Sequence, residues 1–192
     1  MEILKKAIAV LTNGRLMCNT PSIGIIQMLP EHDFKEDIEE WITNWVSVYN
    51  PGLEAVPCPF AKGAMMKRSI QYLVMESKLE LDMRLADIST LPEGKEVIAI
   101  GIDPDLITAD DLRELVQFHN YGHFMDEGLI TLEDHPDALE LINGVKMNQG
   151  VWAIVLIQSS VKLHEATQKL RAQGYYKNWT PENIKEVVSW RP

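Results

Sequence analysis

Three apolar runs in this chain predict the strands of a sheet. Val97–Ile102 and Trp152–Ile157 are almost continuously apolar, which is typical of strands that are buried on both faces. Ile70–Met75 is a further strand candidate. Segments with helical spacing separate and follow these runs. We therefore expect a single domain with an α/β (α+β) sandwich fold, in which helices pack on a small mixed sheet of about three to five strands.

The clearest predicted helix begins at Asp33, which is a good N-cap with Glu36 at the capping-box position. Its apolar face carries Trp41 and Trp45, and two tryptophans on one face imply deep burial. Similar patterns predict helices over 2–11, 79–89, 108–121, 161–173 and 180–190, and a short helix that starts at Pro59.

Two segments do not fit this alternation of strands and helices. Residues 1–31 read as an N-terminal extension that packs on the single domain of residues 1–192. Residues 126–151 lack a clear period. A long irregular segment inside a compact domain is usually functional or disordered, so this segment is a candidate for the site.

The charge balance restricts the partners of the protein. Its formal net charge is −10 and its pI is about 4.9, and an acidic surface repels nucleic acid and anionic lipid. The compact basic cluster of Lys62, Lys67 and Arg68 is large enough for one anionic group only. We expect a small-molecule ligand, no nucleic acid and no membrane partner, while the oligomeric state stays open.

The cysteine content and the apolar runs predict a compartment. Cys18 and Cys58 are the two cysteines of the chain, which excludes a disulfide framework and favours reduced thiols. The start of the chain lacks the apolar run of a signal peptide, and no stretch has the roughly 20 apolar residues of a membrane span. We therefore expect a soluble, cytoplasmic protein.

Three histidines fall close together between residues 119 and 135. His119 and His123 have the four-residue spacing that lets two imidazoles on one helix bind one metal ion. With His135 and either Glu127 or Asp134 they would form a His and carboxylate set that suits non-haem iron. However, Gly122 is expected to end the helix between the two, so a metal-free acid–base role or a structural role is equally open.

Cys58 is the candidate nucleophile. It lies between two prolines at the start of a predicted helix, with Lys62 one turn along, an environment that favours a thiolate. In the leading hypothesis Cys58 supplies the thiolate and His119 or His135 the acid–base function. Lys62 or Arg68 would anchor an anionic substrate. Two further substrate-binding candidates are Tyr121, beside the histidines, and Asn143, in a polar loop before the last strand.

The order of these features resembles an uncharacterised bacterial family of the DUF1415 type, which carries a Cys-Pro-Phe-Ala motif and a later Phe-His-Pro segment. The matching residues are Trp41, then Val56-Pro57-Cys58-Pro59-Phe60-Ala61-Lys62, Asp103-Pro104 and Phe118-His119-Asn120-Tyr121, within residues 41–165. Asn120 departs from the family pattern, which has proline there. The resemblance adds no reaction, and it implies that Cys58 and His119 share a site.

Two rival hypotheses accompany the thiol enzyme. One is a metalloprotein that uses the histidine and carboxylate set, with a transition metal such as iron as its cofactor. The other is a non-enzymatic, acidic binding or assembly module whose 126–151 segment docks a partner. Catalytic partners must come within hydrogen-bond reach. The separation between Cys58 and the histidines therefore distinguishes the enzyme from the binding module.

Overall fold

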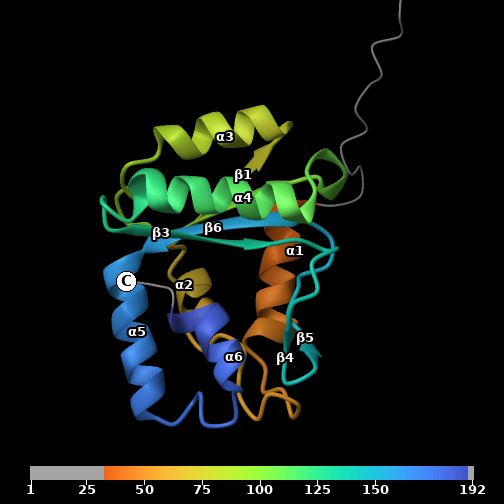
Figure 1. The fold of residues 1–192 in the computed structure, drawn as a ribbon, viewed down its shortest axis with the longest axis vertical. Coiled ribbons are helices and arrows are strands. Elements are labelled where there is room, and N and C mark those ends of the chain that lie inside the picture. Colours follow the sequence, from red (N-terminus) through yellow and green to blue (C-terminus); the bar gives the residue numbers. More distant parts are fainter. Residues whose placement is uncertain (1–32, 190–192) are drawn as a thin grey trace, which may run out of the picture.

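The structure, a computed structural model, describes residues 33–189 of the chain. These residues form an α+β fold in which helices cover both faces of one sheet (Figure 1). Helices α3 and α4 lie on one face, called here the α3–α4 face. Helices α1, α2, α5 and α6 lie on the other, called here the α1 face. The predicted fold class is therefore confirmed.

The main sheet has the strand order β1-β2-β6-β3. The strands are β1 (Ile70–Met75), β2 (Val97–Ile102), β3 (Leu129–Asp134) and β6 (Ala153–Ser159). β1 and β2 are parallel, whereas β6 is antiparallel to both of its neighbours. It follows that β1, β2 and β3 all run in the same direction, with β6 inserted against them. A small separate hairpin pairs β4 (Leu141–Ile142) with β5 (Val145–Lys146).

Side-chain caps start most of the helices where the sequence predicts. Asp33 accepts a hydrogen bond from the backbone N–H of Glu36, and Thr108 does the same for Asp111. The helical elements are α1 (Phe34–Trp41), η1 (Ile42–Val46), α2 (Ala61–Met66), α3 (Lys78–Asp87), η2 (Pro104–Leu106), α4 (Ala109–His119), η3 (Asn120–Phe124), α5 (Ser160–Ala172), α6 (Pro181–Ile184) and η4 (Lys185–Ser189).

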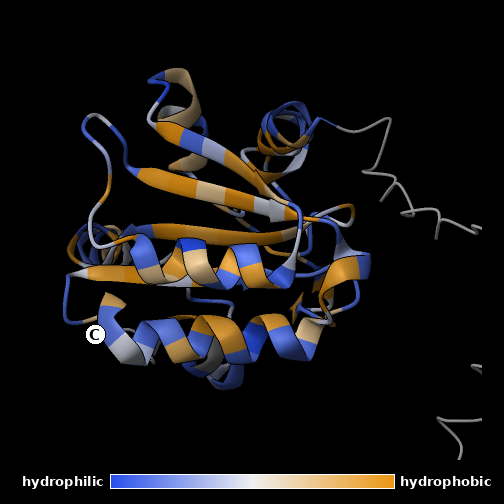
Figure 2. Cartoon of the chain, turned by 90° about the horizontal axis from the view of Figure 1, so that it is seen from above, coloured by the Kyte–Doolittle hydropathy of each residue, from blue (hydrophilic) through white to orange (hydrophobic). Residues whose placement is uncertain are grey.

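Two apolar cores lie on the two faces of the sheet. Alternate residues of each strand point to opposite faces, so Ile98 and Ile100 join the core under α3 and α4, whereas Ala99 and Ile154 join the core on the α1 face. Figure 2 shows strands that are mainly hydrophobic and helices that carry both hydrophilic and hydrophobic residues. The double covering explains why β2 and β6 are apolar almost throughout.

Three details differ from the sequence-based predictions. The segment 126–151 is not irregular, because it contains β3 and the β4–β5 hairpin. The helix after Pro59 begins later, at Ala61. Trp41 and Trp45 stack on each other with ring centroids 5.9 Å apart, and both are half-buried rather than deeply buried. The core positions of that helix belong to smaller side chains and to Phe34.

The predictions for the N-terminal part of the chain have no counterpart in the described residues. The helix over 2–11 and the extension over 1–31 lie outside the described residues, as does Cys18. Within residues 33–189, no helix combines the length and the apolar character that crossing a membrane requires.

Candidate functional site

The three strands that run in the same direction end at one edge of the sheet, where polar residues follow them. Ser77 follows β1 and caps α3, and Asp103 follows β2 and caps η2. β3 ends at Asp134, with His135 next. In open α/β sheets, ligands bind in the crevice outside the carboxyl ends of the strands. This edge is therefore where a ligand site is expected.

A cleft of about 620 Å³ opens there. One wall is formed by residues 104–111 and Arg113, which belong to η2 and the beginning of α4. The opposite wall is formed by residues 137–139, which follow β3. The volume lies in the range of roughly 300–1,000 Å³ that is usual for ligand sites.

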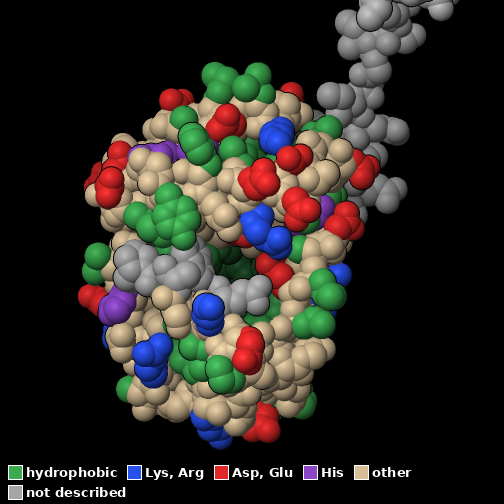
Figure 3. Space-filling model, in the orientation of Figure 1, with side chains coloured by type: hydrophobic (Ala, Val, Ile, Leu, Met, Phe, Trp, Pro, Cys, Tyr) green, Lys and Arg blue, Asp and Glu red, His purple; other side chains and the backbone are tan. Residues whose placement is uncertain are grey.

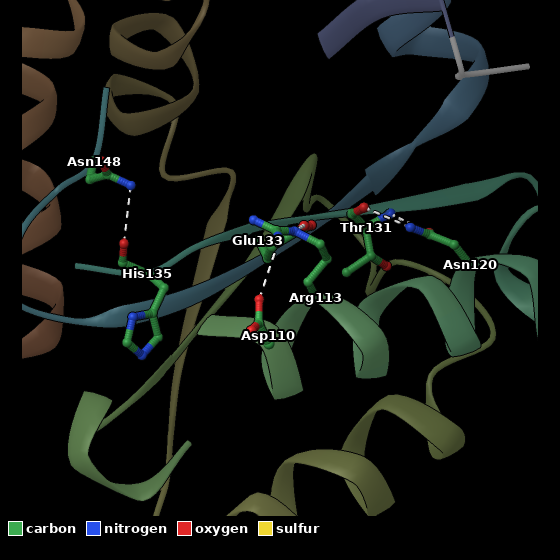
Figure 4. A network of polar contacts seen from close by, with 7 residues as sticks. All are labelled: Asp110, Arg113, Asn120, Thr131, Glu133, His135 and Asn148. Atoms are coloured by element: carbon green, nitrogen blue, oxygen red, sulfur yellow. Dashed lines mark hydrogen bonds and ion pairs between the residues drawn. The ribbon is translucent and has the colours of Figure 1, made fainter. Parts of the chain in front are cut away.

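Carboxylates dominate among the charged side chains that line the cleft. Its aspartates are Asp105, Asp110, Asp111 and Asp137, and its basic residue is Arg113. The Arg113 guanidinium already has partners, since Nη1 lies 3.5 Å from Oδ1 of Asp110 and Nε lies 3.8 Å from Oε1 of Glu133 (Figure 4). The cleft therefore carries an excess of negative charge and favours a cationic ligand.

Neighbouring groups shift the ionisation of the carboxyl groups around the cleft. The Lys78 ammonium, whose Nζ lies 3.1 Å from Oδ1 of Asp111, bonds that carboxyl and holds its pKa below the ordinary value. Burial has the opposite effect on Glu133 and raises its pKa, although the charge of Arg113 opposes the shift. The pKa of Asp111 therefore lies below that of Glu133.

The raised pKa of Glu133 predicts a pH-dependent stability. An acid with a higher pKa in the folded state binds more protons when folded. Its contribution to stability is therefore present below the ordinary pKa of 4.5 and is lost as the pH rises towards the folded pKa. We expect the free energy of unfolding of Glu133→Gln, relative to the wild type, to increase between about pH 4 and about pH 7. Urea denaturation at each pH measures this difference.

The matched control is Glu114→Gln, which removes an exposed carboxyl from α4. This surface substitution should change the free energy of unfolding by less than about 0.5 kcal/mol. If the difference in free energy of unfolding between Glu133→Gln and the wild type does not change with pH, the Glu133 carboxyl has the same pKa in the folded protein as in the unfolded chain.

Asp134 fixes the loop that leads into β6. Its Oδ1 accepts a hydrogen bond of 2.8 Å from Nδ2 of Asn148, and its Oδ2 accepts one of 2.7 Å from the backbone N–H of Gln149. Asn148 also donates to the carbonyl of His135, at 3.0 Å (Figure 4). Burial raises the pKa of Asp134, and these hydrogen bonds oppose the shift. Asp134 therefore has a positioning role at the edge of the sheet.

His135 is fully engaged in holding the wall of the cleft. Its Nδ1 accepts a hydrogen bond of 3.1 Å from the backbone N–H of Asp137, so the proton must be on Nε2. That nitrogen donates to the carbonyl of Ile107, at 2.9 Å. His135 thus joins the two walls, and this geometry favours a structural role over the predicted acid–base role.

His119 is buried, as its position on the apolar face predicts, with 3% of its surface exposed. Its Nε2 lies 2.8 Å from Oδ1 of Asp82, which joins α4 to α3. The rings of His119 and His123 lie edge to face with centroids 5.3 Å apart. Nε2 of His123 is buried without a hydrogen-bond partner in the described part of the chain. Gly122 does not end the helix, which continues as η3.

The predicted metal set is not assembled. In residues 33–189, no three His, Cys, Asp or Glu side chains come together in a way that could hold a metal ion. His119 and His123 are neighbours, but His135 is bonded to Ile107 beyond the other end of α4. The four predicted ligands, with Glu127 exposed, therefore do not converge.

Cys58 lies on the α1 face, where it packs against the core that contains Phe34 and Trp152. It lies three positions before Ala61, the first residue of α2, and its N–H donates to the carbonyl of Val46, at 2.9 Å. It therefore lacks the helix N-terminus that the sequence predicts. The sheet separates it from α4, which carries His119, so the structure does not bring the predicted pair together.

The predicted substrate-binding residues also lie apart. Lys62 and Arg68 are exposed in and just after α2. Asn143 is at the turn of the β4–β5 hairpin with a φ of 51°, and its Nδ2 donates to the carbonyl of Asn178, at 2.9 Å. Tyr121 is exposed in η3. None of these residues lines the described cleft.

Sequence reasoning missed Asp110, Arg113 and Glu133, which form or border the cleft. They were missed because β3 was not predicted from the sequence. A strand prediction over Leu129–Asp134 would have followed from the β-branched and apolar residues after Gly128. It would have brought Glu133 to the carboxyl edge, next to the start of α4.

A scan against protein-family models, a search of curated proteins and a search of solved structures found no match for this chain. The resemblance to the Cys-Pro-Phe-Ala family therefore stays a prediction.

Proposed function

We propose that this protein is a binding module that holds a basic segment of a partner protein in the cleft at the carboxyl edge of its sheet. The observation that carries the proposal is the lining of the cleft, in which aspartates outnumber the single arginine, itself already paired. A Lys or Arg side chain entering the cleft would meet carboxylates at partly exposed positions, where such pairs add modest affinity and strong selectivity for charge.

The rim of the cleft offers an apolar contact beside these charges. Leu139 is 82% exposed and lines the wall formed by residues 137–139. The opposite wall includes Leu106 and Ala109. A segment that combines basic and apolar side chains fits this mixture better than a simple cation does.

The charge of the whole protein supports the same kind of partner. A net charge of −10 attracts basic segments over several ångströms and raises their rate of association, an effect that salt screens. We therefore expect binding that weakens as the ionic strength increases.

The geometry favours binding over the thiol–histidine enzyme. That enzyme requires Cys58 within hydrogen-bond reach of a histidine. Cys58 packs on the α1 face, whereas His119 belongs to α4 on the other face, and both ring nitrogens of His135 are occupied.

The test is the binding of a fluorescein-labelled peptide of alternating Gly and Lys, measured by fluorescence anisotropy. We expect the double variant Asp110→Asn, Asp137→Asn to bind this peptide about fivefold more weakly than the wild type, since each exposed charge pair contributes up to about 1 kcal/mol. Raising the salt from about 0.1 M to about 0.5 M should weaken wild-type binding further.

Two controls make the test specific. Asp87→Asn removes an exposed carboxylate from α3, outside the cleft lining, and should leave the affinity unchanged. A peptide of alternating Gly and Glu should not bind. Equal affinities of the double variant and the wild type for the Gly–Lys peptide would overturn the proposal.

A further inference from the structure

The outer face of α4 changes character along its length. Asp110, Glu114, Gln117 and Tyr121 recur at spacings of four, three and four residues, which places them in one stripe along the helix, and all are exposed. The stripe is acidic at the end of α4 that forms the cleft and aromatic at the other end.

The far end of the stripe belongs to a larger apolar patch. Phe118 and Tyr121 are each 70% exposed, and Met83 on α3 is 62% exposed. The bond of 2.8 Å between His119 and Asp82 joins the two helices here. Phe118 directly precedes His119 and Met83 directly follows Asp82, so both belong to the helical turns that this bond joins. We call these three residues, Met83, Phe118 and Tyr121, the α3–α4 patch.

The α3–α4 patch is unusual for a surface. Soluble proteins expose single apolar side chains freely, whereas a group of large ones marks an interaction site. Figure 3 shows the α3–α4 layer in the upper part of the molecule, with both acidic and apolar side chains exposed on it. The patch and the cleft are joined by the stripe on α4.

We infer that the partner segment is a basic amphipathic helix that lies along the outer face of α4. This inference rests on the proposed function and names the partner of the same site. The basic end of the partner helix lies at the acidic cleft, and its apolar face covers the α3–α4 patch. Charge complementarity decides the orientation, because the exposed carboxylates of Asp110 and Glu114 are at the cleft end of the stripe.

The dimensions fit a helix of ordinary length. α4 has 11 residues, so it is about 16 Å long, and a partner of about three turns would cover both the cleft end and the patch. An amphipathic helix that lays its apolar face on a surface formed by two helices is a recurrent mode of peptide recognition.

The experiment compares two labelled peptides of about 14 residues that contain only Leu and Lys in equal proportions. One has its Leu residues on a single helical face, and the other has them spread evenly around the helix. We expect the amphipathic peptide to bind the wild type at least about tenfold more tightly than the spread peptide. It should also gain helical circular dichroism when it binds. Phe118→Ser should abolish both the difference in affinity between the two peptides and the gain of helical circular dichroism.

The matched control is Val161→Ser, which removes an exposed apolar side chain from α5 on the α1 face and should change neither affinity. The two proposals fail in different ways. If the double variant Asp110→Asn, Asp137→Asn weakens both peptides but Phe118→Ser weakens neither, the helical partner is wrong and the acidic binding site stands. If the double variant weakens neither peptide, the acidic site itself is wrong. Self-association of the wild type that Phe118→Ser abolishes would assign the patch to a second copy of this chain and overturn the inference.

Discussion

Replacing Asn120 by alanine is expected to lower the free energy of unfolding by about 3 kcal/mol. The Asn120 side chain is buried, its Nδ2 donates to the carbonyl of Thr131 at 2.9 Å, and its Oδ1 accepts from the N–H of Thr131 at 2.8 Å. β3 is an edge strand, so these bonds take the place of a neighbouring strand. Without the amide, one buried N–H and one buried carbonyl lose their partners, at about 1–3 kcal/mol each.

Urea denaturation followed by circular dichroism measures this loss. Asn44→Ala is the matched control, because it removes an exposed amide whose Nδ2 donates to Oε1 of Glu40, at 3.3 Å, and should change stability by less than about 0.5 kcal/mol. A loss below about 1 kcal/mol for Asn120→Ala would mean that water replaces the amide at the edge of β3.

Gly101→Ala is expected to destabilise the protein by about 2 kcal/mol. A Cβ built on Gly101, the next-to-last residue of β2, would lie 2.5 Å from Cδ2 and 2.7 Å from Cε2 of Phe34. The Phe34 ring cannot retreat freely, since it also packs against Trp152, with centroids 5.2 Å apart. The added methyl group must displace the ring or the strand, as overpacking in a dense core does.

Gly122→Ala is the matched control for this prediction. A Cβ at Gly122, in η3, meets nothing within 4 Å, and alanine has the higher helix propensity. Its midpoint of urea denaturation should equal or exceed that of the wild type, whereas that of Gly101→Ala should fall. If the two variants shift the midpoint in the same direction, the contact between Gly101 and Phe34 does not limit the side chain at this position.

These predictions concern contacts that the sequence does not reveal. The helical spacing of Leu112, Leu115 and Val116 predicted that the next position, His119, faces inwards, and it is buried. Nothing in the local pattern identified Asp82 as its partner, because Asp82 lies 37 residues away on α3. The same holds for Asn120, whose role depends on which strand lies at the edge of the sheet.

In the candidate site, too, some features have local signals in the sequence and others depend on the tertiary structure. The Asn143-Gly144 pair and the apolar residues after Gly128 were local signals for the hairpin and for β3. With both elements in place, Glu133 and the cleft wall would have been expected at the carboxyl edge. The separation of Cys58 from the histidines could not have been predicted, since it depends on which face of the sheet each helix covers.

The sequence by itself determined the fold class, three of the strands in the main sheet, and the starting points of α1 and α4. Hydrophobic periodicity and side-chain caps are local properties, and they act within a few residues along the chain. Only the tertiary structure decided that β6 is inserted between β2 and β3 and that Arg113 meets Glu133. It also decided that the acidic cleft and the apolar patch share one helix. Those features depend on strand order and on the packing of helices from distant parts of the chain, which no local pattern specifies.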